Sequence, residues 1–194
     1  MKVNEIFYSL QGEGVHAGEA AVFVRLSGCN LCCPFCDTDH AYGSEMTESA
    51  VVAEVLRYPA RLVVVTGGEP SLQLTSSLVD AMHAAGRTVA VETNGTRCLP
   101  PNVDWVTLSP KEIFLGSEAR PVLTEVDELK ILYDGQHEPC IPHGVTVRHA
   151  CCLQPMDTGD AARNAEVTRA TVEYVKQHPQ WRLSLQQHKI LNIR

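Results

Sequence analysis

Four cysteines lie within eight residues near the start of the chain, in the run Cys29-Asn-Leu-Cys32-Cys33-Pro-Phe-Cys36. Three of them, Cys29, Cys33 and Cys36, have the spacing C-x3-C-x2-C. Thiolates this close in sequence can converge on one metal centre, and soft sulfur ligands favour iron–sulfur clusters or zinc. A four-iron cluster held by three protein thiolates keeps one iron open, whereas an electron-transfer ferredoxin would fill that position with a fourth cysteine. The spacing therefore predicts a [4Fe–4S] cluster with one iron free to bind another ligand.

Zinc is the main alternative, because the same run also contains two adjoining C-x2-C pairs, Cys29 with Cys32 and Cys33 with Cys36. Structural zinc sites usually separate such pairs by about a dozen residues or more, so that two loops can meet around one ion. Zinc is therefore the weaker interpretation. Cys32 is surplus to a three-thiolate cluster, and we expect its thiol to point away from the metal.

Composition limits the class of protein. The 194 residues, 44% of them hydrophobic, suit one domain spanning residues 1–194. The segment Met1–Tyr8 lacks the apolar core of a signal peptide, and no stretch is long enough to span a bilayer. We therefore expect a cytoplasmic protein with reduced thiols and no membrane partner. The net charge of −7, without a basic stripe, argues against direct binding of nucleic acid and favours a small-molecule substrate.

Short apolar runs alternate with amphipathic segments along the chain. Eight runs have the length and composition of strands: Val3–Tyr8, Ala20–Leu26, Leu62–Val65, Thr88–Val91, Val103–Leu108, Leu129–Tyr133, Val145–Leu153 and Trp181–Leu185. Three segments have helical periodicity: Glu48–Arg57, Leu74–Ala85 and Val167–His178. The alternation predicts an α/β fold with a mainly parallel sheet. Because only about three main helices accompany eight strands, we expect a reduced, incomplete (β/α) barrel.

Several loops that follow predicted strands carry distinctive residues. The strand Leu62–Val65 leads into Gly67-Gly68-Glu69-Pro70, and glycines at a strand end let the backbone approach a ligand closely. Ser109-Pro110-Lys111 and Gln154-Pro155-Met156-Asp157 follow two later strands. Taken alone, each motif is more typical of an ordinary surface turn than of a ligand site. Ligands gather at the carboxyl ends of parallel strands, however, so together these loops are expected to share one site.

Three thiolates and one open iron are typical of radical S-adenosylmethionine (SAM) enzymes, whose open iron chelates SAM, and the chain resembles that superfamily. Other motifs narrow the resemblance. Gln11-Gly12-Glu13-Gly14 lies between the first two predicted strands, Arg25 is near the end of the second, Glu92-Thr93-Asn94-Gly95 ends the fourth, and His188-Lys189 is near the carboxyl end. In this order, over nearly the whole chain, they resemble the 7-carboxy-7-deazaguanine synthase (QueE) family.

The resemblance implies a reaction and its cofactors. The family rearranges 6-carboxy-5,6,7,8-tetrahydropterin into 7-carboxy-7-deazaguanine, with ring contraction and loss of ammonia, as a carbon–nitrogen lyase of queuosine and deazapurine biosynthesis. A reduced [4Fe–4S] cluster cleaves SAM to a 5′-deoxyadenosyl radical, which removes hydrogen from C6 of the pterin, and SAM is re-formed afterwards. The resemblance also implies Mg²⁺, a flavodoxin-type electron donor and a homodimer, on a radical SAM barrel.

The family's residue roles map onto this chain as expectations, and no protein side chain is expected to be catalytic, because the SAM-derived radical carries the chemistry. The cluster ligands are Cys29, Cys33 and Cys36, and Thr38 is the magnesium ligand. The SAM contacts are Phe35, Cys36, Asp37, Gly68, Ser109, Pro110, Lys111, Gln154, Pro155, Met156 and Asp157. The substrate contacts are Leu10, Gln11, Gly12, Glu13, Arg25, Thr66, Glu92, His188 and Arg194. Arg194 departs from some relatives, which end in proline.

These roles agree with the chemistry of the side chains. A carboxylate such as Glu13 or Glu92 can accept two N–H donors from the aminopyrimidinone edge of a pterin, and Arg25 can pair with a substrate carboxylate through its planar fork. Two other functions keep the cysteine motif but change its use. One is a radical SAM activase that abstracts hydrogen from a glycine of a partner protein, and the other is a zinc-stabilised binding module.

Overall fold

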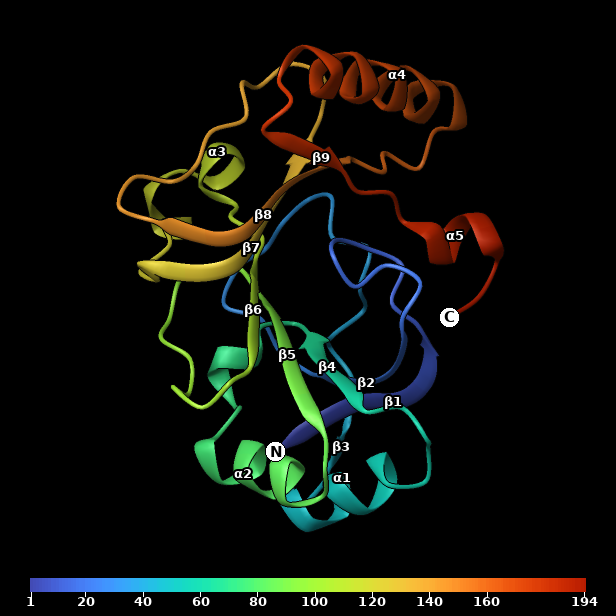
Figure 1. Cartoon of the computed structure of the whole chain (residues 1–194), viewed down its shortest axis with the longest axis vertical. Coiled ribbons are helices and arrows are strands. Elements are labelled where there is room, and N and C mark those ends of the chain that lie inside the picture. The colour runs from blue at the N-terminus through green and yellow to red at the C-terminus, as the bar shows by residue number, and fades with distance from the viewer.

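The computed structural model describes all residues, 1–194, and contains one nine-stranded sheet (Figure 1). The strands are β1 (Lys2–Leu10), β2 (Ala20–Leu26), β3 (Ser44–Glu45), β4 (Leu62–Gly67), β5 (Thr88–Thr93), β6 (Trp105–Leu108), β7 (Glu125–Tyr133), β8 (Thr146–Pro155) and β9 (Trp181–Leu183). The helices are α1 (Glu48–Val55), α2 (Ser76–Ala84), α3 (Glu112–Leu115), α4 (Ala161–Gln177) and α5 (Gln187–Leu191), with short 3₁₀ turns at Pro70–Leu72 and Ser117–Ala119.

The sheet is mainly parallel and open. Its order is β3-β1-β2-β4-β5-β6-β7-β8-β9; β1 is antiparallel to β2 and β3, and every other neighbouring pair is parallel. The predicted incomplete barrel and its eight strands are confirmed. The two-residue strand β3 was missed because it is too short and too exposed to show a periodic pattern. β7 begins at Glu125, four residues before the predicted start, because Asp127 and Glu128 conceal its apolar character.

The three main helices are the predicted ones, and each begins at a side-chain cap. Thr47, Thr75 and Asp160 accept a hydrogen bond from a backbone N–H in the first turn of α1, α2 and α4, respectively. The four-residue α3 and five-residue α5 were not predicted, because a single turn carries no helical period. None of the helices combines the length and the apolar character needed to cross a bilayer.

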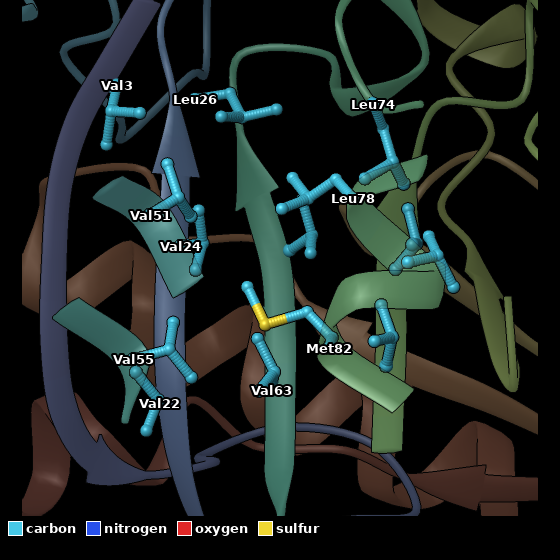
Figure 2. Close-up of a cluster of buried hydrophobic side chains, with 14 of the residues drawn as sticks. Val3, Val22, Val24, Leu26, Val51, Val55, Val63, Leu74, Leu78 and Met82 are labelled. Atoms are coloured by element: carbon cyan, nitrogen blue, oxygen red, sulfur yellow. The ribbon is translucent and has the colours of Figure 1, made fainter. Parts of the chain in front are cut away.

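The largest hydrophobic core lies between the first half of the sheet and helices α1 and α2. Val22, Val24 and Leu26 of β2 point to this side and are completely shielded from solvent. Figure 2 shows them opposite Val51 of α1 and Met82 of α2, among the other side chains of the cluster. This packing fixes β2 and β4 against the two helices, so the opposite face of these strands is free to form a site.

Strand alternation places polar side chains on that opposite, inner face. Val24 and Val91 belong to the core beneath α1 and α2, so the next residues along, Arg25 and Glu92, face inward. On β7 the neighbours of Lys130 pack into a second core with Leu153 and Trp181, and Lys130 itself faces inward. Side chains that are distant in sequence therefore share one surface of the sheet.

The open side of the sheet is closed by the loop after β1. Gly14 N–H donates to Ser184 Oγ at 2.9 Å, and Val15 N–H donates to Glu128 Oε2 at 3.2 Å. Gln187 N–H of α5 donates to the carbonyl oxygen of Gly12 at 3.0 Å. In Figure 1 the segment containing α5 accordingly lies beside the early loops of the chain. These bonds join β1 to β7 and to the segment after β9, so that the interior is covered although the barrel is incomplete.

Candidate active site

A pocket of about 650 Å³ lies on the inner face of the sheet. Its lining contains nearly all of the residues that were expected to bind the cluster, SAM, magnesium or the substrate: Leu10, Gln11, Gly12, Glu13, Arg25, Cys29, Cys33, Phe35, Cys36, Asp37, Thr38, Thr66, Gly68, Glu92, Ser109, Lys111, Gln154, Met156, Asp157, His188 and Arg194. Pro110 and Pro155 are expected SAM contacts that do not line it. Cys32 also lies outside the lining. Motifs spread over almost the whole chain thus converge on one cavity.

The cysteine loop connects β2 to β3 and has no regular secondary structure around its thiols. Cys29 and Cys33 are partly buried and Cys36 is exposed, yet all three line the pocket. Burial raises the pKa of the Cys29 and Cys33 thiols. A metal centre would have to displace their protons, because thiolates are the ligating form.

The donor set fits a cluster better than a single ion. No three or more His, Cys, Asp or Glu side chains are grouped so that they could hold one metal ion. Zinc needs its ligands about 2.3 Å from a common centre, whereas the three thiolates of a [4Fe–4S] cluster bind three different irons. Three soft sulfur donors that face one cavity from a loop without regular secondary structure, with Cys32 outside the pocket lining, match the second requirement.

The glycine loop after β4 packs directly on the cysteine loop. The amide of Gly68 donates to the Leu26 carbonyl, and that of Glu69 donates to the Gly28 carbonyl, both at 2.9 Å. A Cβ at Gly68 would collide with the Gly28 carbonyl oxygen, so only glycine allows this approach. The requirement for glycine in Gly67-Gly68-Glu69-Pro70 is therefore steric, and it sets the loop against Cys29.

Glu69 of the same loop is buried and ties it to the end of β5. Its carboxylate accepts hydrogen bonds from Thr93 Oγ1 at 2.7 Å and from the backbone N–H of Asn94 at 2.8 Å. It also accepts from the N–H of Ser71 at 3.0 Å. Because its carboxylate accepts hydrogen bonds from three groups of the protein, Glu69 connects the loop after β4 to the loop after β5.

Several side chains expected around SAM lie at the carboxyl ends of β6 and β8, where Gln154 and Pro155 are the last two residues of β8 and not, as had been predicted, part of a following loop. Lys111 Nζ donates to the carbonyl oxygen and hydroxyl of Ser109 at 2.7 and 2.6 Å, and burial lowers the pKa of Lys111 to about 8. Asp37 and Asp157 share Lys189, at 2.8 and 2.7 Å. Burial would raise the pKa of Asp37, but the hydrogen bond and charge of Lys189 together with the hydrogen bond from Gln186 outweigh burial and lower that pKa.

Four polar side chains form a cross-bonded group at the other end of the pocket. Lys130 Nζ lies 2.5 Å from Glu13 Oε2 and 3.3 Å from Glu92 Oε1. Gln11 donates to Glu92 Oε1 at 2.9 Å, and Gln186 donates to Glu13 Oε1 at 3.0 Å. We call Gln11, Glu13, Glu92 and Lys130 the acidic end of the pocket. It offers carboxylate acceptors to a ligand that is rich in N–H donors.

A separate cationic region surrounds Arg25. Its Nε donates to Glu5 Oε1 at 3.0 Å, and one terminal nitrogen donates to Thr38 Oγ1 at 3.2 Å. Arg194 also pairs with Glu5, and both guanidinium groups lie over the ring of Phe7. One terminal nitrogen of Arg25 makes no hydrogen bond within the protein, which leaves it available to an anionic ligand.

Among the charged or polar residues of this pocket that were not predicted as site residues are Lys130, Glu5 and Gln186. The signal for Lys130 was present, because a lone lysine interrupts the apolar run Leu129–Tyr133 of a predicted buried strand. Glu5 occupies an inward position on β1, which alternation could have shown. Gln186 follows a strand in a segment without a pattern, so nothing in the sequence singles it out.

The chain resembles known proteins over its full length. A model of the radical SAM superfamily matches residues 23–112. A 7-carboxy-7-deazaguanine synthase from Bacteroides thetaiotaomicron is 50% identical over 194 residues, covering 100% of this chain and 98% of that protein. One from Burkholderia multivorans is 41% identical over 213 aligned positions, covering 98% of each chain.

Comparison with solved structures points to the same family as comparison of the sequences. The crystal structure of QueE from Escherichia coli superposes with a TM-score of 0.71 at 28% sequence identity, covering 95% of this chain and 92% of that one. The radical SAM superfamily implies a [4Fe–4S] cluster and SAM, for which the three pocket thiols are suitable donors. With half of its residues identical to those of a full-length relative, the chain belongs to the 7-carboxy-7-deazaguanine synthase family of radical SAM enzymes.

Proposed function

We propose that this protein converts 6-carboxy-5,6,7,8-tetrahydropterin into 7-carboxy-7-deazaguanine, a precursor for queuosine and related deazapurines. The observation that carries the proposal is the shared pocket: three thiols, an acidic end and an arginine with a free donor line one cavity of about 650 Å³. A pterin acid has an N–H-rich aminopyrimidinone edge and a carboxylate, which are complementary to the acidic end and to Arg25.

The different chemistry of the two ends of the pocket suggests which residues bind each ligand. Cys29, Cys33 and Cys36 would hold the cluster, and the loops containing Gly68, Ser109 and Gln154 would contact SAM. When bound, the cluster and SAM supply a 5′-deoxyadenosyl radical that abstracts hydrogen from the substrate. The chain itself contributes the binding, the orientation and the shielding of the site.

Orientation is the task of the two ends of the pocket. Glu13 and Glu92 accept N–H donors from the pterin edge, and Arg25 pairs with the substrate carboxylate. Glu5 accepts a hydrogen bond from Arg25 Nε at 3.0 Å and Thr38 accepts one from a terminal nitrogen, which leaves the other terminal nitrogen for the substrate carboxylate. A substrate held at both ends presents a fixed carbon to the radical, which is the main requirement for a selective hydrogen abstraction.

Shielding is the task of α5 and its flanking residues. Lys189 binds Asp37 on the cysteine loop and Asp157 after β8, and Gln186 also donates to Asp37 at 3.1 Å. The short helix α5 is therefore held over the pocket by bonds to the cysteine loop and to the segment after β8. Excluding water and other hydrogen donors protects a reactive radical from side reactions.

Mg²⁺ is a further part of the proposal, with Thr38 as its protein ligand. The Thr38 hydroxyl lines the pocket and accepts only one hydrogen bond, from Arg25, so its oxygen retains a lone pair for a cation. Magnesium keeps several waters and commonly takes one or two protein ligands together with substrate oxygens. The substrate carboxylate near Arg25 is the expected second ligand.

The remaining proposals rest on family membership: a flavodoxin-type electron donor, a homodimer, a single functional domain spanning residues 1–194 and a cytoplasmic location. A glycyl-radical activase, which was the second enzyme hypothesis, would have to admit a segment of a partner protein. The loop after β1 and α5 cover this interior and are bonded to each other, which favours a small substrate over a polypeptide.

The test is a turnover assay with anaerobically purified protein, the tetrahydropterin, SAM, Mg²⁺ and a chemical reductant. We expect a brown protein containing iron and sulfide that releases ammonia with each product molecule. A catalytic amount of SAM should support many turnovers, because SAM is re-formed. Release of one 5′-deoxyadenosine for each product would contradict this use of SAM, and the absence of the deazaguanine product would refute the proposed function.

A further inference from the structure

Lys130 is a buried lysine in the middle of β7. Its residue exposure is 4%, although the strand around it is otherwise apolar from Leu129 to Leu132. Burying an ammonium group costs several kcal/mol unless it is paired and hydrogen-bonded, so lysine is among the residues least often found fully buried. A lysine buried at this position therefore needs charged partners that offset the cost of burying its ammonium group.

Its partners are two carboxylates from different parts of the chain. Glu13 comes from the loop after β1 and Glu92 from β5, and Lys130 Nζ lies between them at 2.5 and 3.3 Å. The other Glu13 oxygen accepts from Gln186 at 3.0 Å. Glu92 Oε2 makes no hydrogen bond within the protein, so this oxygen remains free for a ligand in the pocket.

Lys130 is the cation that lies between these two carboxylates and offsets the repulsion between their charges. Carboxylates that share a buried site repel each other, and one of them then binds a proton. Burial by itself would raise the pKa of Glu13, but the attraction of Lys130 outweighs it and lowers that pKa. Burial would lower the pKa of Lys130, and the charges of Glu13 and Glu92 raise it instead.

We propose that Lys130 is a positioning residue of the substrate pocket, which keeps Glu13 ionised and holds Glu13 and Glu92 at a fixed spacing so that they accept the N–H donors of the pterin edge. This inference rests on the proposed function, since it assigns the residue a role in binding that substrate. A protonated carboxyl would present a donor to the N–H edge of the substrate, and the orientation of the pterin would then be lost.

Other charged groups around the acidic end influence whether the carboxylates are protonated when the charge of Lys130 is removed. The titratable groups that face Lys130 or Glu13 are Glu13, Glu92, Glu128, Lys111, Cys152 and His188. Glu128 is buried beside Lys130 on β7 and adds a third carboxylate to the group. Loss of Lys130 would leave Lys111 and His188 as the only basic groups, so at least one carboxylate should become protonated at neutral pH.

The experiment measures kcat and KM for the tetrahydropterin from about pH 6 to about pH 9, the range in which a perturbed carboxyl would titrate. The variants are Lys130→Met, Lys130→Gln and Lys130→Arg. In Lys130→Met and Lys130→Gln we expect kcat/KM to fall roughly 30-fold or more, mainly through KM, as for one partner removed from a buried ion pair. The acid limb of the kcat/KM profile should move to higher pH, and Lys130→Arg should retain the wild-type profile.

Controls separate this role from a general loss of structure. Lys176→Met removes an exposed lysine of α4 that pairs only with Glu173, and it should change neither KM nor the pH profile. Cluster absorbance and SAM binding should be unchanged in all variants. In the double variant Glu13→Gln with Lys130→Met, the loss should be smaller than the product of the single losses, because the lysine acts through that carboxylate.

The outcomes are distinct. Wild-type turnover together with an unchanged KM and pH profile in Lys130→Gln would overturn the role of Lys130 and leave the proposed function standing. Absence of wild-type turnover would instead refute the proposed function. If Lys130→Met does not fold, the comparison of Lys130→Gln with Lys130→Arg decides, because both can donate hydrogen bonds and only the arginine is charged.

Discussion

The two ends of the pocket differ in how far the protein orders them by itself. At the cysteine end, the thiols lie on a loop without regular structure, and Cys36 is exposed. Within Cys29–Cys36 the bonds are few: the Cys36 N–H donates to the Cys33 carbonyl at 3.1 Å, and the Leu31 N–H approaches Cys29 Sγ at 3.4 Å. The bonds that join the loop to the rest of the protein are made mainly by Gly28, Asn30 and Asp37, and not by the thiols. At the acidic end, Glu13 and Lys130 are almost fully buried and bonded to each other.

This difference indicates which ligand each end was built for. A metal cluster brings strong bonds of its own, so its loop need not be ordered in advance, and binding energy can supply the order. An organic substrate makes weaker contacts, and its site gains affinity when the partner groups are already fixed. The acidic end is accordingly preorganised, whereas the cysteine end depends on the cluster.

The largest effect is expected at the cysteine end. Replacing Cys29, Cys33 or Cys36 by Ala removes one of the three proposed protein ligands, so each variant should lose cluster assembly and turnover altogether. Iron content, visible absorbance and product formation measure this. Cys32→Ala is the matched control and should keep both, since Cys32 does not line the pocket.

Hydrogen exchange on the same variants tests the comparison of the two ends directly. Backbone amides around Glu13 and Lys130 should exchange at the wild-type rate in Cys33→Ala, whereas those of the cysteine loop should exchange faster than in the cluster-bound enzyme. Faster exchange at the acidic end without the cluster would show that this end is not independently ordered.

A smaller effect is expected at Thr38, between the two ends. A hydroxyl is a weak neutral ligand, so Thr38→Ala should raise the Mg²⁺ concentration for half-maximal rate several-fold, by the roughly 1 kcal/mol of one lost contact. Cluster content and SAM binding should stay unchanged. Thr38→Ser keeps the oxygen and should restore most of the metal response; an unaltered response in Thr38→Ala would remove this residue from the metal site.

The smallest effect concerns the fastening of α5 by Lys189. Because its pair with Asp37 and Asp157 is partly exposed, Lys189→Met should raise KM only a few-fold, and added salt should weaken the wild-type closure. Hydrogen exchange over residues 187–191 would report the loosening. Lys176→Met, outside the pocket, serves as the control, and unchanged exchange in Lys189→Met would show that other contacts hold the helix.

The pH dependence of this fastening follows from the directions of the pKa shifts. The pKa values of Asp37 and Asp157 are lowered in the folded protein, so their contribution is complete above their unfolded values, near pH 4, and is lost as pH falls further. The pKa of Lys189 is raised, so its contribution persists through neutral pH and is lost only in strong alkali. Closure of α5 should therefore be constant across the physiological range and weaken in acid.

All strands except β3, the three main helices and the cysteine motif could be predicted from the sequence alone. These features depend on neighbouring residues: alternation defines a strand, Thr47 and Asp160 cap helices within one turn, and C-x3-C-x2-C places three thiols in one loop. The family motifs identified most of the pocket lining as well, because each is a short contiguous pattern at a strand end.

Which side chains of the pocket bond to each other could be seen only in the tertiary structure. The Lys130–Glu13 pair joins residues 117 positions apart, and the bond from Gln186 to Glu13 spans 173 positions. No local pattern encodes such contacts, because they depend on strand order, register and the way the loop after β1 closes the open sheet. Which charges meet, and hence which carboxylates stay ionised, is a property of that arrangement: the energy of a charge pair depends on separation in space and on burial, and neither can be read from separation along the chain.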